Sequence, residues 1–252
     1  MNQSFRFLGA LAFGALSTLT LNACVISIDD DDVRSYAYDD GDVPIIGETV
    51  ATRSFDRVSL KGADDVVIVP GDTPSWMVSS ESGDVRDLRI AVEDDTLRIR
   101  RLDGRNYGDG GDRATIIVTT PMLYGVSVSG SGDATITEMV GENAAINIAG
   151  SGDVSVGNVN VSQLDVKIAG SGEAVIAGAA GLMNLSIAGS GELDGADLNV
   201  ARAAVSVAGS GDAEFASNGE VDASVIGSGD ITVRGSAICN ADRNGSGSIS
   251  CG

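Results

Sequence analysis

The sequence contains no histidine, only three cysteines and four prolines, and ten aromatic residues (five Phe, one Trp and four Tyr) among its 252 positions. Without histidine, the chain cannot build a Ser-His-Asp or Cys-His catalytic set. The glycine-rich stretches near Gly108 and Gly245 lead into neither a lysine nor a helical pattern, so they do not predict phosphate-binding loops. The scarcity of aromatic side chains also leaves few platforms on which a sugar ring could stack.

Positive charge is scarce as well. The chain has 16 Lys and Arg residues against 36 Asp and Glu residues, which gives a formal net charge of −20. A chain with this charge repels polyanions, so we expect no nucleic-acid partner and no basic cleft for phosphates. We also expect no cofactor, because no cofactor-binding motif is present.

The chain begins with a pattern typical of a secretory signal peptide, over residues 1–23. Arg6 precedes an apolar run (residues 7–21) that is short for a membrane span. This run leads into Leu-Asn-Ala-Cys24, which resembles the lipobox of bacterial lipoproteins. The resemblance implies cleavage after Ala23 and attachment of a lipid to Cys24. The alternative is ordinary signal-peptidase cleavage near Ala23, which leaves Cys24 as a spare thiol.

A lipid on Cys24 would make a membrane the first partner of the protein. The protein would then be exported, to the periplasm or the cell surface. Val25 stands where an aspartate often retains lipoproteins in an inner membrane, so we expect anchoring in the outer one.

Residues 24–52 are predicted to form an acidic tether. Seven aspartates lie between Asp29 and Asp42, with a single arginine among them. Such a segment self-repels and buries too little apolar surface to fold alone. It lacks the glycine and the distant glutamate of an EF-hand loop, so a calcium site is not predicted there.

The clearest feature of the sequence is a corner of Gly-Ser-Gly-acid that recurs about every 20 residues. The first glycine of each corner falls at positions 130, 150, 170, 189, 209, 227 and 245. Apolar residues alternate around each corner, two and four positions before that glycine and four and six positions after it. Alternation predicts strands with one buried face. Seven copies at nearly constant spacing predict a repeat architecture.

The repeat length of about 20 residues distinguishes between the candidate folds. A propeller blade needs about twice this length, and the leucine-rich-repeat pattern is absent. A sandwich does not require equal spacing. A parallel β-helix does, because each coil is one repeat and equivalent residues stack about 4.8 Å apart. We therefore predict an all-β parallel β-helix (solenoid) with coils of about 20 residues over residues 126–252, ending in a C-terminal cap. Ile168 should lie in mid-stack between Ile148 and Ile187.

An all-β N-terminal part is predicted for residues 53–125, continuous with the array. The stretch RVSLKGADDVVIV places Val58 and Leu60 before Gly62, and Val66 and Ile68 after it, at the offsets of the later repeats. Two further alternating stretches, DLRIAVEDDTLRIRR and RATIIVTTP, follow it.

The stretches FDRVSLKGADDVVIV, AVEDDTLRI and PMLYGVSVSGSGDATI, followed by serial GSGD corners, resemble the head GIN domain of the family described as putative autotransporter adhesins. The resemblance covers roughly residues 53–236. It implies a right-handed β-helix in an exported envelope protein. It carries over no catalytic residue.

An acid stands three positions after the first glycine of six corners, and a serine does so in the seventh: Asp133, Asp153, Glu173, Glu192, Asp212, Asp230 and Ser248. Stacked like charges must face solvent, where each neighbouring pair repels by about 1 kcal/mol. Each coil supplies one carboxylate, and Asp, Glu and Ser interchange, so we expect no metal site. We interpret this ladder as a solvated corner that keeps the edges apart. The alternative is weak calcium binding.

A second outward ladder lies three positions before the glycine and is a candidate interaction face. Most of its residues are small and polar, so the face should be flat: Ser127, Asn147, Lys167, Ser186, Ser206 and Ser224. A flat, regular face could contact an envelope protein or a glycan. The alternative is that it is only the solvated side of a sheet.

Cys239 and Cys251 lie six residues before and six after Gly245, so a glycine corner would bring them together. Export permits oxidation, and we predict a disulfide between them that stabilises the last coil. The alternative is two free thiols.

Three functional hypotheses follow. The first is a non-enzymatic envelope lipoprotein that presents a surface for adhesion or assembly. The second is a β-helical enzyme acting on polysaccharides, which would need clustered acids, a basic partner and long loops around a groove. The third is a purely structural envelope component. We favour the first, because Lys167 is the only lysine of the array and the return segments are short.

Overall fold

The computed structural model describes residues 48–51, 53–79, 85, 87–102 and 113–252, all within a compact unit that spans residues 36–252. Cys24, the predicted signal peptide and most of the predicted tether lie outside the described residues. The described residues form strands and turns and contain no helix. The strands are β1 (Glu48–Val50), β2 (Arg57–Gly62), β3 (Asp65–Pro70), β4 (Ser75–Val78), β5 (Leu88–Glu93), β6 (Thr96–Arg101), β7 (Thr115–Thr120), β8 (Gly125–Gly130), β9 (Ala134–Ile136), β10 (Met139–Gly150), β11 (Val154–Gly170), β12 (Glu173–Gly189), β13 (Glu192–Gly209), β14 (Asp212–Gly227), β15 (Asp230–Arg234), β16 (Ile238–Gly245) and β17 (Ser248–Cys251).

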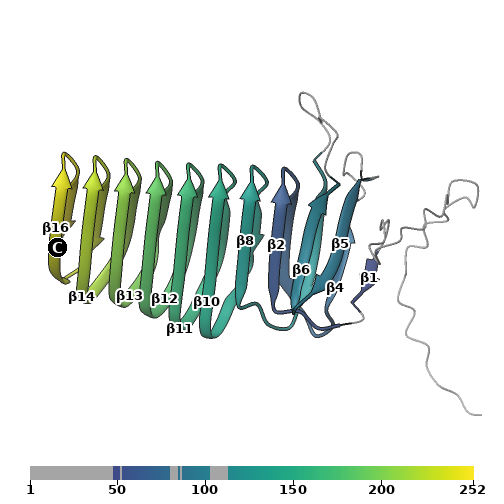
Figure 1. Ribbon diagram of the computed structural model, residues 1–252. Coiled ribbons are helices and arrows are strands. Elements are labelled where there is room, and N and C mark those ends of the chain that lie inside the picture. The colour runs from purple at the N-terminus through teal and green to yellow at the C-terminus, as the bar shows by residue number, and fades with distance from the viewer. Residues whose placement is uncertain (1–47, 52, 80–84, 86, 103–112) are drawn as a thin grey trace, which may run out of the picture. The chain divides into compact units, whose positions relative to one another are not determined.

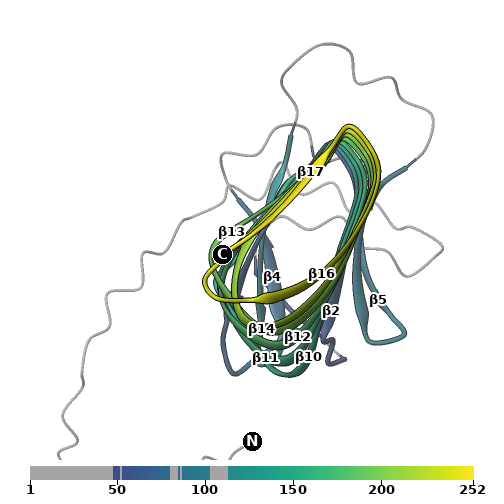
Figure 2. The ribbon, with the colours of Figure 1, turned by 90° about the vertical axis from the view of Figure 1, so that its left-hand side faces the viewer.

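The repeats stack as parallel coils, as the spacing predicts (Figure 1). Ile148 pairs with Ile168 and Ile168 with Ile187, each one coil further along. Each coil runs up one sheet to the glycine corner, down a second sheet and back through a return segment (Figure 2). The prediction of a parallel β-helix with coils of about 20 residues is therefore confirmed. We call the sheet before the corner the leading sheet and the sheet after it the trailing sheet.

The core is the interior of these coils. Ile148, Ile168 and Ile187 are at most 2% exposed, and the other predicted apolar ladders are buried beside them. The one gap in these ladders, Gly195, pairs with Phe215 in the next coil. A Cβ on Gly195 would lie 2.7 Å from the carbonyl oxygen of Glu214 and 3.3 Å from the Cβ atoms of Leu198 and Phe215, so this position has little room for a side chain.

The N-terminal coils stack out of chain order. Strand β2 lies between β6 and β8, and β3 lies between β7 and β9 (Figure 1). The first coil is therefore inserted between the second and the third. Val58 and Leu60 pair with Val126 and Val128, which is the register that their offsets from Gly62 predict.

Antiparallel strands lie beyond these coils. Strand β5 pairs antiparallel with β6, β4 with β7, and β1 with β4. Strand β1 (Glu48–Val50) falls inside the segment predicted as a tether, so regular structure begins earlier than the sequence indicates.

A buried ion pair joins the first two coils. Asp64 occupies the position of the second corner glycine and is 1% exposed. Its carboxylate accepts hydrogen bonds from Nε and Nη2 of Arg101, at 2.8 and 2.6 Å, and from the Ala114 amide at 2.8 Å. Loss of this bidentate pair would leave a buried charge uncompensated.

Candidate interaction surface

The glycine corners are closed to ligands because each coil uses the backbone of the coil before it. The amide of Ser151 donates to the carbonyl of Gly130 at 2.9 Å, and that of Ser171 donates to Gly150 at 2.8 Å. A Cβ on Gly170 would overlap that same Gly150 carbonyl. The amides of Ser151 and Ser171 are therefore hydrogen-bonded to the preceding coil and are not free to bind an anion.

The aspartates of the acidic ladder have a structural role that the sequence reasoning missed. Oδ1 of Asp133 accepts the amide of Asp153 at 3.0 Å, and Oδ1 of Asp153 accepts the amide of Glu173 at 2.8 Å. Asp212 and Asp230 accept the amides of the next coil in the same way. Each of these carboxylates thus caps a backbone donor of the following coil.

The two glutamates break this pattern. The amide of Glu192 donates to the carbonyl of Gly172 at 3.1 Å, and that of Asp212 donates to Gly191 at 3.2 Å. Where the preceding coil carries a glutamate, the amide of the following coil donates to a backbone carbonyl instead of a carboxylate. The sequence shows which coils carry Asp and which carry Glu, but it does not show that the aspartates accept an amide of the following coil. Among the described residues, no group of three or more His, Cys, Asp or Glu side chains could hold a metal ion.

Replacing Asp153 by alanine should lower the free energy of unfolding by about 0.5–1 kcal/mol, because the Glu173 amide loses its acceptor. Asp153→Asn keeps an acceptor oxygen and removes charge repulsion, so it should be neutral or slightly stabilising. Urea unfolding of both variants tests this expectation, and equal stability of the two would contradict it.

Calcium should raise the melting temperature only marginally. A large rise that Asp153→Asn abolishes would show metal binding instead.

Burial raises the pKa of Glu173 above its usual 4.5, and the charges of Glu192, Asp153 and Asp194 raise it further. The folded state therefore holds this proton more readily than the unfolded state does. The contribution of Glu173 to stability should rise as the pH falls through its raised pKa, and should level off below the unfolded value. Thermal unfolding between about pH 7 and pH 4 should show a smaller gain in Glu173→Gln than in the parent. An identical gain in both proteins would rule out Glu173 as the group responsible.

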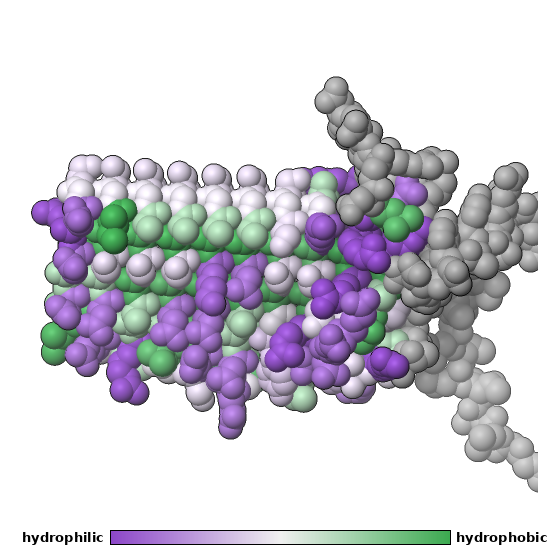
Figure 3. Space-filling view, in the orientation of Figure 1, coloured by the Kyte–Doolittle hydropathy of each residue, from purple (hydrophilic) through white to green (hydrophobic). Residues whose placement is uncertain are grey.

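The structure brings the six residues of the candidate interaction face into one column on the outside of the leading sheet. Ser127 pairs with Asn147, Asn147 with Lys167, and the pairing continues through the remaining members: Ser186, Ser206 and Ser224. All six are exposed or half-buried. Figure 3 shows this side of the coils, where equivalent residues form level rows across successive strands. The pairing therefore aligns the six residues along the stack, one in each coil.

The columns beside this face differ from each other. Towards the corner the residues are small and apolar, namely Ala149, Ala169, Ala188 and Ala208. Away from the corner, the carboxylate of Asp165 accepts hydrogen bonds from Gln163 at 3.0 Å and from Asn184 at 2.7 Å. Near the C-terminal end, Asn240 donates to Asp222 at 3.2 Å. The face is thus polar and acidic beside a strip of alanines.

A shallow depression lies on the leading sheet at its C-terminal end. Its floor is formed by Ala204, Ser206, Asp222, Ser224, Asn240 and Asp242 of three successive strands, β13, β14 and β16. Two members of the candidate interaction face, Ser206 and Ser224, therefore lie in it. The depression forms because the side chains in these columns are small, and the carboxylates of Asp222 and Asp242 line it.

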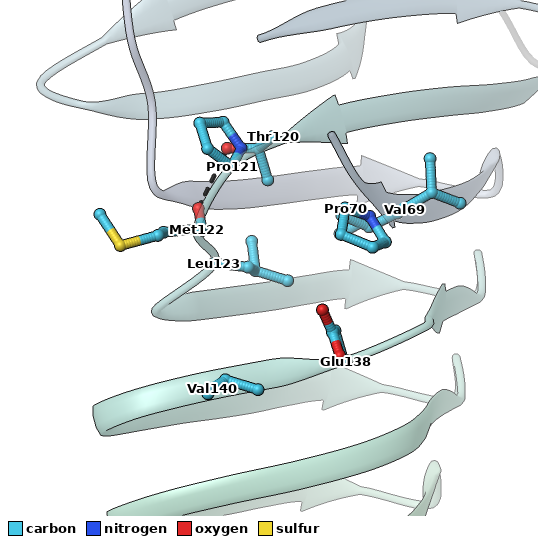
Figure 4. Close-up of a pocket in the computed structure, with 9 residues that line it drawn as sticks. Val69, Pro70, Thr120, Pro121, Met122, Leu123, Glu138 and Val140 are labelled. Atoms are coloured by element: carbon cyan, nitrogen blue, oxygen red, sulfur yellow. Dashed lines mark hydrogen bonds between the residues drawn. The ribbon is translucent and has the colours of Figure 1, made fainter. Parts of the chain in front are cut away.

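A separate hollow lies beside the segment that connects β7 to β8 (Figure 4). Strand β3 ends at Pro70 and β7 ends before Pro121, since a proline cannot donate to the ladder. The hydroxyl of Thr120 lies 3.0 Å from the carbonyl oxygens of both Phe55 and Met122 and has one proton to donate between them. Glu138 supplies the one carboxylate among the lining residues, beside the exposed side chains of Met122 and Val140. Its lining offers no acid–base pair.

Cys239 and Cys251 form a disulfide across the last coil, with their Cα atoms 6.5 Å apart. Beside it, Arg243 occupies a core-ladder position, and its guanidinium donates to the carbonyl of Gly247 at 3.1 Å. The disulfide and Arg243 therefore cover the end of the apolar interior. Cys24 lies outside the described residues, so its lipidation stays a prediction.

The double variant Cys239→Ser/Cys251→Ser should lose about 3 kcal/mol of stability, because the bond closes a loop of roughly 13 residues. Urea unfolding of the oxidised parent and of the variant measures the difference, and peptide mapping without reductant tests the bond in protein taken from the envelope. Freely alkylatable thiols at both positions would sink the expectation.

No helix among the described residues is long and apolar enough to cross a membrane. The stacked coils and flat outer faces define a β-solenoid that displays a regular surface. The sequence model described as "Putative auto-transporter adhesin, head GIN domain" matches residues 54–237, and the chain belongs to this family.

Solved structures share the fold. One described as a putative adhesin from Bacteroides fragilis superposes with a TM-score of 0.73 at 22% identity, covering 82% of this chain and 98% of that one. A putative lipid binding protein from Parabacteroides distasonis gives 0.61 at 23% identity, covering 82% and 97%. A putative adhesin from Parabacteroides merdae gives 0.61 at 16% identity, covering 81% and 93%. No curated protein matches the chain.

Proposed function

We propose that the protein is a non-enzymatic, exported envelope lipoprotein that is anchored to the outer membrane through Cys24. Its solenoid presents the outer face of the leading sheet to an envelope protein or a glycan. The observation that carries this proposal is the single column Ser127–Asn147–Lys167–Ser186–Ser206–Ser224, whose members are aligned in register and exposed or half-buried across six coils. Membership in an adhesin-described family supports a role in surface contact.

Two alternative functions can be distinguished from this proposal by experiment. A polysaccharide-acting enzyme is expected to need clustered acids with a basic partner in a groove. The hollow beside Glu138 holds one carboxylate, and the depression holds Asp222 and Asp242 with no basic side chain in its lining. A purely structural component would need no accessible binding face. Reducing-end release from polysaccharides tests the first rival, and crosslinking in intact envelopes tests the second.

Binding of the labelled full chain to isolated envelopes tests the proposal. Ser186→Arg/Ser206→Arg places two long side chains on the leading face and should weaken binding at least tenfold, or by about 1.4 kcal/mol. Ser155→Arg/Thr232→Arg makes the same change at exposed positions of the trailing sheet and serves as the control. Equal binding by both double variants would overturn the assignment of the face. Separately, Cys24→Ser should release the protein from membranes.

A further inference from the structure

We propose that the depression at the C-terminal end of the leading sheet binds an extended, basic segment of a partner protein. This inference rests on the proposed function and specifies the chemical class of the partner. The floor of the depression carries Asp222 and Asp242 and no basic side chain. Asp222 accepts a hydrogen bond from Asn240, a neutral amide, so its charge is not compensated by that contact.

Nearby arginines do not neutralise this floor. Arg243 follows Asp242, but it points to the opposite side of β16 and donates to Gly247. Arg202 pairs in register with Glu220, further from the corner than the floor residues. The depression therefore keeps its negative charge within a chain whose net charge is −20. Such a field attracts cationic ligands and repels anionic ones.

Exposed apolar side chains flank the depression. Ile238 is 77% exposed and Ile226 is 58% exposed, the highest values among the large apolar residues that the structure describes. Ile226 follows Ser224 by two residues on β14, and Ile238 precedes Asn240 by two residues on β16. Because side chains two residues apart share a face of a strand, both isoleucines project from the same side as the floor.

Strand geometry gives the length of the partner segment. Ile226 pairs in register with Asn244, which lies six residues after Ile238 on β16. Six residues of extended strand span roughly 20 Å. An extended segment of similar length would place apolar residues near both isoleucines and basic residues over Asp222 and Asp242. The face carries none of the aromatic side chains on which sugars stack, so these features favour a polypeptide over a glycan.

Two synthetic peptides of seven residues test the proposal by calorimetry with the full chain. Both carry a valine at each end, and the five residues between alternate threonine with lysine in one peptide and with glutamate in the other. The lysine peptide should bind with an affinity that falls as salt rises, and the glutamate peptide should not bind. Asp222→Asn/Asp242→Asn should weaken lysine-peptide binding at least tenfold, and Ile238→Ser should also weaken it.

Matched variants elsewhere separate a site from general attraction to an acidic protein. Asp153→Asn/Asp212→Asn removes the same charge from the corner ladder, and Val175→Ser removes an exposed apolar side chain from the trailing sheet. Both should bind the lysine peptide like the parent. Equal losses in these controls, unchanged binding by the Asp222/Asp242 variant, or binding of dextran that this variant abolishes would each overturn the proposal. If the parent binds envelopes through the leading face but ignores the lysine peptide, the proposed function stands and this inference fails.

Discussion

Ile168→Asp should unfold the protein or lower its free energy of unfolding by several kcal/mol. Ile168 is 1% exposed and pairs in register with Ile148 and Ile187 in the neighbouring coils. The substitution buries a carboxylate among apolar side chains, and the ladder residues of the two adjacent coils, Ile148 and Ile187, carry no charge that could pair with it. Because equivalent residues touch along the stack, the damage should reach both adjacent coils.

Ala169→Asp is the matched control for this prediction. Ala169 is the next residue on the same strand, but its side chain is exposed on the outer face. Its replacement should change stability by no more than about 0.5 kcal/mol. Circular dichroism during thermal and urea unfolding measures both variants. Similar stabilities would show that the inward assignment of Ile168 is wrong.

Gly170→Ala should be nearly as damaging, for two separate reasons. The backbone of Gly170 has a φ of +132°, a conformation that side chains disfavour by about 1–2 kcal/mol. A Cβ at this position would also overlap the carbonyl oxygen of Gly150 in the preceding coil. Relieving that overlap requires the coils to separate, which should cost a further 1–3 kcal/mol, roughly.

Two other glycines separate these contributions. Gly62 has a φ of +128° but nothing within 4 Å of an added Cβ, so Gly62→Ala reports backbone strain alone. Gly172 lies outside the left-handed region, but its added Cβ would overlap the Gly152 carbonyl, so Gly172→Ala reports the overlap alone. Urea unfolding should place the loss in Gly170→Ala above that of either control. A loss no larger than that of Gly62→Ala would show that close coil stacking does not require the glycine.

The conformation and packing of these glycines explain why the Gly-Ser-Gly corner recurs along the chain. The first glycine takes a left-handed conformation, and both glycines allow neighbouring coils to approach within hydrogen-bonding distance. The corner is therefore a structural element. The candidate binding features lie instead on the outer face of the leading sheet, where side chains are free to vary.

The sequence by itself determined the repeating part of the fold. Ladder positions such as Val58, Ile148 and Ile168 follow from alternation at fixed offsets from a glycine, and a slip by one residue would turn every apolar side chain outward. Alternation and the offset from each glycine are properties of consecutive residues, so a single sequence reveals which side chains face inward. The proximity of Cys239 to Cys251 follows in the same way from their equal distances to Gly245.

Only the tertiary structure decided how the non-repeating parts are arranged. Apolar ladders accept any neighbouring coil of matching pattern, so alternation could not reveal that β2 lies between β6 and β8. Nor could it show that Asp64 pairs with Arg101, 37 residues away, or that Asp153 caps the amide of Glu173. These contacts depend on the distance between atoms in different coils. The depression between Ile226 and Ile238 likewise exists only because stacking places small side chains of three strands side by side.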